Sequence, residues 1–148
     1  MPLFSASRAH LLALALFAGV LPAAHAAEDE ATFLKESVAF FDQQTREHLP
    51  MQVDAQTRLD SIRLDPQGKE LIYSYSLTQQ AAADMDSAAR GRFESDMRGK
   101  LETGSCSQPQ LLDTLRQHGI RIEHRYSGKD SQPLADIHID PQALTCKG

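Results

Sequence analysis

The sequence predicts an α+β domain in which a four-stranded antiparallel sheet, made of two hairpins, carries helices on one face and is closed by one disulfide. Residues 70–77 alternate large apolar side chains with smaller or polar ones, which is typical of a strand with one face on a core. Four strand-like segments come in two pairs, each joined by a short turn. Three other segments have apolar residues at helical spacing, so strands and helices mix along one chain.

The first 26 residues are expected to be a secretory signal peptide. Arg8 precedes an apolar run from Leu11 to Leu21, Pro22 ends the run, and Ala24-His25-Ala26 supplies the small residues that a signal peptidase reads. The run is shorter than the roughly 20 residues that a membrane span needs. The residue directly after the cleavage point is not a cysteine, which argues against a lipid anchor. We therefore expect a periplasmic or secreted protein without a stable membrane anchor.

Residues 27–148 are expected to form a single exported domain. The leader holds one of the 15 basic residues and none of the 20 acidic ones, so the remaining chain has a net charge of −6. A chain of this charge does not attract phosphate backbones, which disfavours a nucleic-acid partner.

The two cysteines, Cys106 and Cys146, are predicted to form a disulfide. An even pair in an exported protein usually does so. The alternative is a redox or metal pair, but redox pairs usually lie two residues apart.

The periodicities set the expected bounds of the elements. Helices are expected at residues 28–48, 85–102 and about 109–118, and strands at 57–65, 70–78, 120–126 and 134–140. Asp84 is the expected N-cap of the second helix, and Gly119 is expected to end the third.

The apolar residues also predict the register of the first hairpin. Pairing Leu64 with Leu71 and Ile62 with Tyr73 places both apolar sets on one side, with Asp60 expected on that same face. In the second hairpin two registers fit the apolar residues. The register that pairs Ile122 with Ile139 is preferred because it also sets Glu123 against His138.

One strand carries a possible metal stripe, Asp136-x-His138-x-Asp140. Alternate side chains on a strand are nearly 7 Å apart, at about 3.3 Å per residue, so three ligands on one straight strand cannot converge on an ion. We therefore predict a charge ladder there and no metal site, and we expect no cofactor.

No residue pattern predicts catalysis. The sequence has no G-x-S-x-G, no H-E-x-x-H and no glycine-rich phosphate loop. The expected core tyrosines, with hydroxyls at its rim, are Tyr73, Tyr75 and Tyr126. His124 is expected on the same face of its strand as Tyr126, and Ser74 and Ser76 are expected to face away from the core. His118 is expected to take part in capping its helix.

A set of residues spread along the chain resembles a family of small exported Gram-negative proteins described as candidate quorum-sensing-regulated virulence factors. The residues that carry the resemblance are Pro50-Met51, Thr57-Arg58-Leu59-Asp60, Tyr73-Ser74-Tyr75, Cys106, Leu112, Gly119, Tyr126 and Cys146. The resemblance implies a secreted α+β domain without an assigned activity, and it supplies no catalytic residues.

These observations lead us to expect a non-catalytic binding protein of the periplasm or the exterior, acting on a protein partner that the sequence does not identify. A virulence-associated or envelope role is one form of this function. The alternatives are a periplasmic inhibitor or immunity protein, or a small periplasmic enzyme that uses His124 and the tyrosines if they line a cleft.

Overall fold

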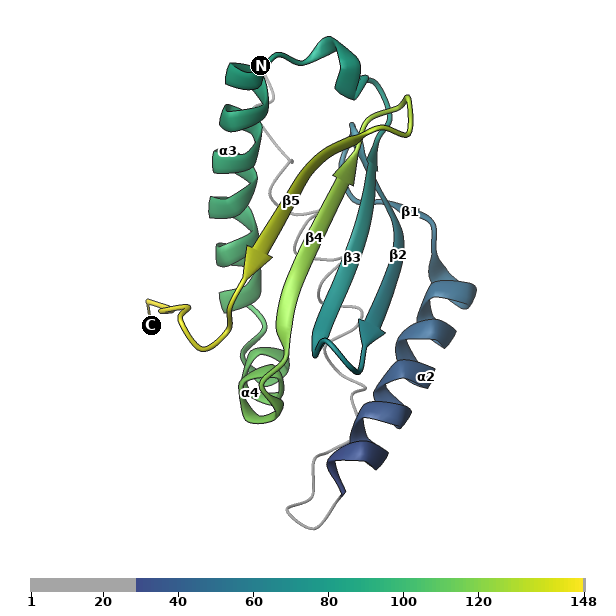
Figure 1. Ribbon diagram of the computed structural model, residues 1–148, viewed down its shortest axis with the longest axis vertical. Helices are drawn as coiled ribbons and strands as arrows, with labels where there is room; N and C mark the ends of the chain where they lie inside the picture. The colour runs from purple at the N-terminus through teal and green to yellow at the C-terminus, as the bar shows by residue number, and fades with distance from the viewer. Residues whose placement is uncertain (1–28, 148) are drawn as a thin grey trace, which may run out of the picture.

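The computed structural model describes residues 29–147, in which three helices pack on a five-stranded sheet (Figure 1). The predicted signal peptide, residues 1–26, lies outside this range. Within it, no helix combines the length and the apolar character needed to cross a membrane. The elements are α2 (Glu30–His48), β1 (Met51–Gln52), β2 (Thr57–Asp65), β3 (Glu70–Leu77), η1 (Ala82–Asp84), α3 (Ser87–Cys106), α4 (Pro109–His118), β4 (Arg121–Ser127) and β5 (Pro133–Ile139).

The sheet is mixed, which corrects the prediction of four antiparallel strands. Its order is β1-β2-β3-β4-β5, and β3 pairs with β4 in parallel while the other neighbours are antiparallel. The reason lies in α3, whose 20 residues span about 30 Å, close to the roughly 26 Å of the eight-residue strand β3. Together with α4 it returns the chain to the start of β3, where Arg121 pairs with Glu70.

The two predicted hairpins are present with the predicted registers. In the first, Leu64 pairs with Leu71 and Ile62 with Tyr73. In the second, Ile122 pairs with Ile139. The agreement follows because a slip of one residue would turn each apolar set away from the core.

The prediction for Asp60 is wrong, because β2 contains a bulge between Leu59 and Ser61. A bulge adds one residue to a strand and inverts the alternation beyond it. Leu59 therefore takes the inner face and is buried. Asp60 instead accepts a hydrogen bond from the hydroxyl of Ser76, at 2.5 Å.

Helices lie along both sides of the sheet, with α2 beside β2 and α3 beside β5 (Figure 1). β1 pairs only with Arg58 and Leu59, so within residues 29–147 the second half of β2 has no further strand on its outer side. There the hydroxyl of Thr45, on α2, accepts from the backbone N–H of Ile62 at 3.0 Å and donates to its carbonyl at 2.8 Å. On the other side, Arg98 of α3 donates to the carbonyl of His138 in β5 at 2.8 Å. These contacts satisfy backbone groups that would otherwise be open to another strand.

The ends of α3 and α4 follow capping chemistry. The expected cap Asp84 lies in η1, and the N-cap of α3 is Asp86, whose carboxylate accepts from the backbone N–H of Ala89 at 2.7 Å. The helix therefore begins two residues later than predicted. Gly119 ends α4 with φ of +64°, in the left-handed region that glycine adopts at little cost, as predicted.

One face of the sheet and the inner faces of the helices form a single core. It joins Phe33 and Phe41 of α2, Met97 of α3 and Leu115 of α4 to the apolar residues of β2–β5. The opposite face has no helix against it among the described residues and carries mainly charged and hydroxyl side chains. The prediction that the helices pack on one face agrees with this arrangement.

Candidate functional site

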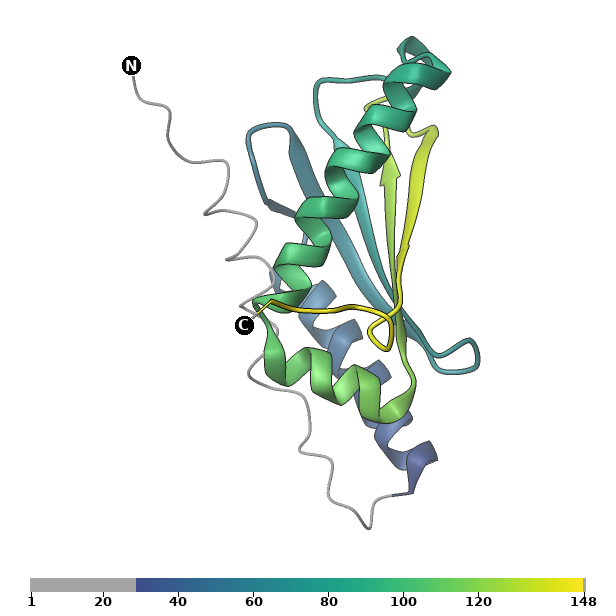
Figure 2. The same cartoon turned by 90° about the vertical axis from the view of Figure 1, so that its left-hand side faces the viewer.

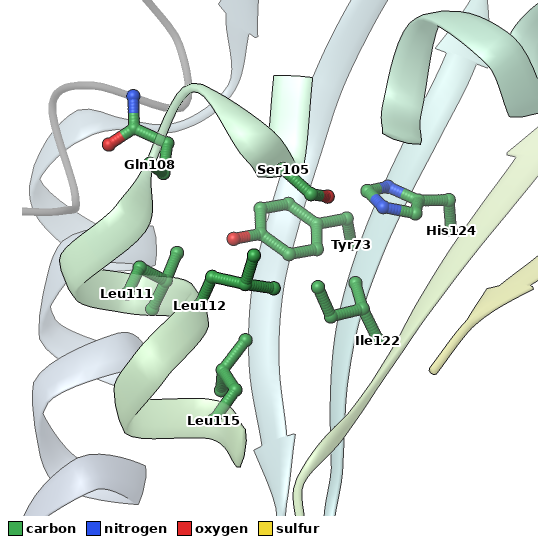
Figure 3. Close-up of a pocket in the computed structure, with 8 residues that line it drawn as sticks. All are labelled: Tyr73, Ser105, Gln108, Leu111, Leu112, Leu115, Ile122 and His124. Carbon is green, nitrogen blue, oxygen red and sulfur yellow. The ribbon is translucent and has the colours of Figure 1, made fainter. Parts of the chain in front are cut away.

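A small cavity lies between α4, the end of α3 and the sheet (Figure 3). Its volume of about 10 Å³ leaves room for one water molecule. The lining residues are Tyr73, Ser105, Gln108, Leu111, Leu112, Leu115, Ile122 and His124. Half of these residues are leucine or isoleucine, and the other half, Tyr73, Ser105, Gln108 and His124, carry a polar group.

The parallel pairing of β3 and β4 creates the polar part of this cavity. Tyr73 and His124 are direct partners across the two strands, and their rings stack with centroids 5.0 Å apart. Leu111, Leu112 and Leu115 are spaced to lie on one side of α4, and all three are buried.

His124 is almost completely buried and forms one hydrogen bond. Its Nδ1 lies 3.1 Å from the hydroxyl of Tyr75, while its Nε2 has no hydrogen-bond partner among the described residues. In Figure 3 the nitrogen-bearing edge of the ring points toward the hydroxyl of Ser105 and the cavity. Burial lowers the pKa of His124 to about 3, so the imidazole is neutral at physiological pH.

The tyrosines form a stacked row beside this histidine. Tyr75 stacks on Tyr126 with centroids 4.6 Å apart, and Phe93 of α3 contacts Tyr126 edge-on at 5.2 Å. Burial raises the pKa of Tyr73, Tyr75 and Tyr126 above the ordinary value, so their hydroxyls stay protonated. The core position predicted for them is correct, but the hydroxyl of Tyr75 points to His124 inside the core and not to the rim.

Cys106 and Cys146 form a disulfide that holds the C-terminal segment beside the cavity, with the two Cα atoms 5.4 Å apart. Figure 2 shows this segment crossing to the junction of α3 and α4. Arg116 of α4 holds the same segment by donating to the carbonyls of Pro141 and Leu144, each at 2.8 Å. The disulfide and the arginine together fix the position of α4 against the sheet.

His118 takes part in a contact that sequence reasoning missed. Its Nδ1 lies 2.7 Å from a carboxylate oxygen of Glu30, and its ring stacks on Phe33 at 3.5 Å. Lys69 donates to the other oxygen of Glu30 at 3.0 Å and to the carbonyl of His118 at 3.2 Å. The group therefore links the start of α2, the end of α4 and the turn between β2 and β3. Glu30 and His118 are 88 residues apart in the sequence, which no local pattern reveals.

On the helix-free face of the sheet, Glu70, Glu123 and His138 converge from three neighbouring strands. One ligand atom from each lies within 4.8 Å of the other two. Glu123 and His138 are the direct partners predicted from the second hairpin. Glu70 joins them only because β3 runs parallel to β4 in this register. Asp136 and Asp140, the other members of the Asp-x-His-x-Asp stripe, are not part of the group.

Fold and site together define an α+β domain with a mixed five-stranded sheet, helices on one face, a disulfide, and a small cavity lined by aliphatic and polar residues. The chain belongs to the family described as a domain of unknown function, DUF8479, whose model matches residues 32–134. A search among curated proteins found no match.

Two solved structures are similar to this chain. The first is a protein of Pseudomonas aeruginosa provisionally described as secreted, with a TM-score of 0.58 and 16% identity over 80% of this chain and 99% of that one. At this identity the likeness shows a shared fold. The second is the type II secretion system pilotin AspS of Vibrio cholerae, with a TM-score of 0.46 and 10% identity over 93% of this chain and 98% of that one. The second score is too low to establish a common fold.

Proposed function

We propose that the protein is an exported binding protein that acts without catalysis, in the periplasm or outside the cell. Three features support export: the leader pattern of residues 1–26, the disulfide between Cys106 and Cys146, and a fold like that of a protein described as secreted. We further propose that the protein binds another protein and needs no cofactor for this.

The observation that carries the non-catalytic part of the proposal is the state of His124. A general base works best with a pKa near the operating pH, and burial holds this one at about 3. Its Nδ1 faces the hydroxyl of Tyr75 and not a carboxylate that could stabilise a charged imidazole. Tyr73, the other ionisable group in the cavity, is held protonated by burial. The cavity groups are therefore suited to hydrogen bonding and poorly suited to proton transfer.

The proposal is tested by locating the protein and capturing its partner in place. Cells are fractionated, and a photo-crosslinking amino acid replaces one exposed residue on each side of the molecule. Arg63 of β2 serves for the helix-free face and Ser95 of α3 for the helical side, because both residues are exposed.

We expect the protein in the periplasm or the medium, and a discrete protein adduct from at least one of the two positions. Retention in the cytoplasm, or the absence of any discrete adduct from both positions, would contradict the proposal. If the captured partner is an enzyme whose activity the protein lowers, the function is that of an inhibitor or immunity protein.

The resemblance to quorum-sensing-regulated virulence factors extends the proposal to a virulence-associated role. This extension predicts that expression rises with cell density and that a deletion strain is impaired in a host model. If expression follows the same course during growth in a quorum-sensing mutant and in its parent, the virulence-associated role is contradicted, while the proposed binding function is unaffected.

A further inference from the structure

We propose that Glu70, Glu123 and His138, on the helix-free face of the sheet, form a binding site for a divalent transition metal ion of the Zn²⁺ class. The site uses one residue from each of β3, β4 and β5. It is separate from the cavity beneath α4 and does not depend on the binding function proposed above.

The spacing of the three donors suits a single ion. Atoms no more than 4.8 Å apart have a common centre within about 2.8 Å of each, and Zn–N and Zn–O bonds measure about 2.0–2.2 Å. Small side-chain rotations close that difference. The sheet supplies a rigid base, because Glu123 and His138 are paired residues and Glu70 lies on the adjacent strand.

The donors that face the centre are not engaged in strong contacts with one another. The closest approaches are 3.4 Å from Nδ1 of His138 to Glu70 and 3.9 Å from its Nε2 to Oε1 of Glu123, and neither is a short hydrogen bond. Glu123 is only 5% exposed although it lies on the helix-free face. Oε2 of Glu123 is paired with Arg125, so the oxygen that remains for an ion is Oε1, which faces His138.

Arg125 holds the side chain of Glu123 in place and leaves one of its carboxylate oxygens available to an ion. Its guanidinium donates to Oε2 of Glu123 at 2.9 Å, which leaves Oε1 directed at His138. Outer hydrogen bonds of this kind commonly fix metal-binding carboxylates.

The donor set determines the class of ion. Two carboxylates and one imidazole suit Zn²⁺ and neighbouring transition metals, whereas Ca²⁺ and Mg²⁺ prefer oxygen ligands only. His138 has a side chain 60% exposed to solvent, so the remaining coordination positions are open to water or to a ligand.

The test titrates Zn²⁺ alone into the tag-free, disulfide-bonded protein at neutral pH, by calorimetry, and repeats the titration with Co²⁺ to record its absorption spectrum. We expect one saturable site, and a loss of affinity of at least about tenfold in His138→Gln and in Glu123→Gln. His48→Gln is the matched control, because His48 is similarly exposed but lies at the end of α2. Its affinity should be unchanged.

His138→Gln keeps the test decisive if Glu123→Gln unfolds, because an exposed side chain contributes little to the fold. Circular dichroism checks that each variant retains its structure. The proposal is overturned if the wild-type protein shows no saturable Zn²⁺ binding, if His138→Gln binds as tightly as wild type, or if an excess of Ca²⁺ displaces the ion.

Discussion

The hydroxyl of Thr45 is the most informative single group to remove, because it satisfies two backbone groups of β2 at once. In Thr45→Val the side chain keeps nearly the same shape, but the N–H and the carbonyl of Ile62 lose their partner. An unsatisfied buried backbone group costs about 1–3 kcal/mol. The site is only partly buried, so the lower end applies to each group, and we expect a loss of about 2 kcal/mol in the free energy of unfolding.

Urea denaturation followed by circular dichroism measures this loss. With a slope of about 1–3 kcal/mol per molar urea, a loss of about 2 kcal/mol lowers the midpoint by about 1 M. Thr45→Ser is the control, since it keeps the hydroxyl and gives up one methyl group, which costs at most about 0.8 kcal/mol. The reasoning fails if Thr45→Val unfolds at the wild-type midpoint, or if the serine variant falls as far as the valine variant.

Three further predictions test other parts of the fold. Replacing both cysteines with serine should lower the free energy of unfolding by about 4 kcal/mol, which is the value of the chain-entropy model for a separation of 40 residues. Urea denaturation measures the loss, and an unchanged midpoint would contradict this prediction. The hydrogen bond from His118 lowers the pKa of the Glu30 carboxyl below 4.5 in the folded protein. The folded protein therefore gains stability above pH 4.5, and this gain is lost as the pH falls through the folded-state pKa of Glu30. Glu30→Gln should therefore cost less than about 1 kcal/mol near neutrality and nothing in strong acid, because the carboxylate is 44% exposed; an equal difference at both pH values would refute this. Gly91→Ala should stabilise α3 by up to about 1 kcal/mol, whereas Gly128→Ala should destabilise by about 1–3 kcal/mol because its Cβ would lie 2.2 Å from the backbone nitrogen of Ala82; thermal melts that reverse this order would contradict it.

Local patterns were sufficient to predict most of the elements and both hairpin registers. Each hairpin joins residues close in sequence, and its two apolar sets fit a common face in few ways. The same reasoning failed at Asp60, because a bulge at Leu59 and Ser61 inverts the alternation. Strict alternation cannot reveal a bulge, although Leu59 in place of a polar residue was a sign that the inner face shifts there.

The pairing between the two hairpins could not be predicted in this way, and the chemistry of the molecule depends on it. β3 and β4 are separated by α3 and α4, so their direction and register follow from how far those helices carry the chain. This one pairing places Tyr73 against His124 in the cavity and brings Glu70 to Glu123 on the opposite face. Sequence reasoning set Glu123 against His138 correctly and still indicated only a charge ladder, because the third donor comes from the hairpin that it had not placed. A test of zinc binding at Glu70, Glu123 and His138 therefore also tests the parallel register. Glu70 pairs with Arg121, and a two-residue shift of β3 away from Glu123 would remove Glu70 from the group while leaving both hairpins intact.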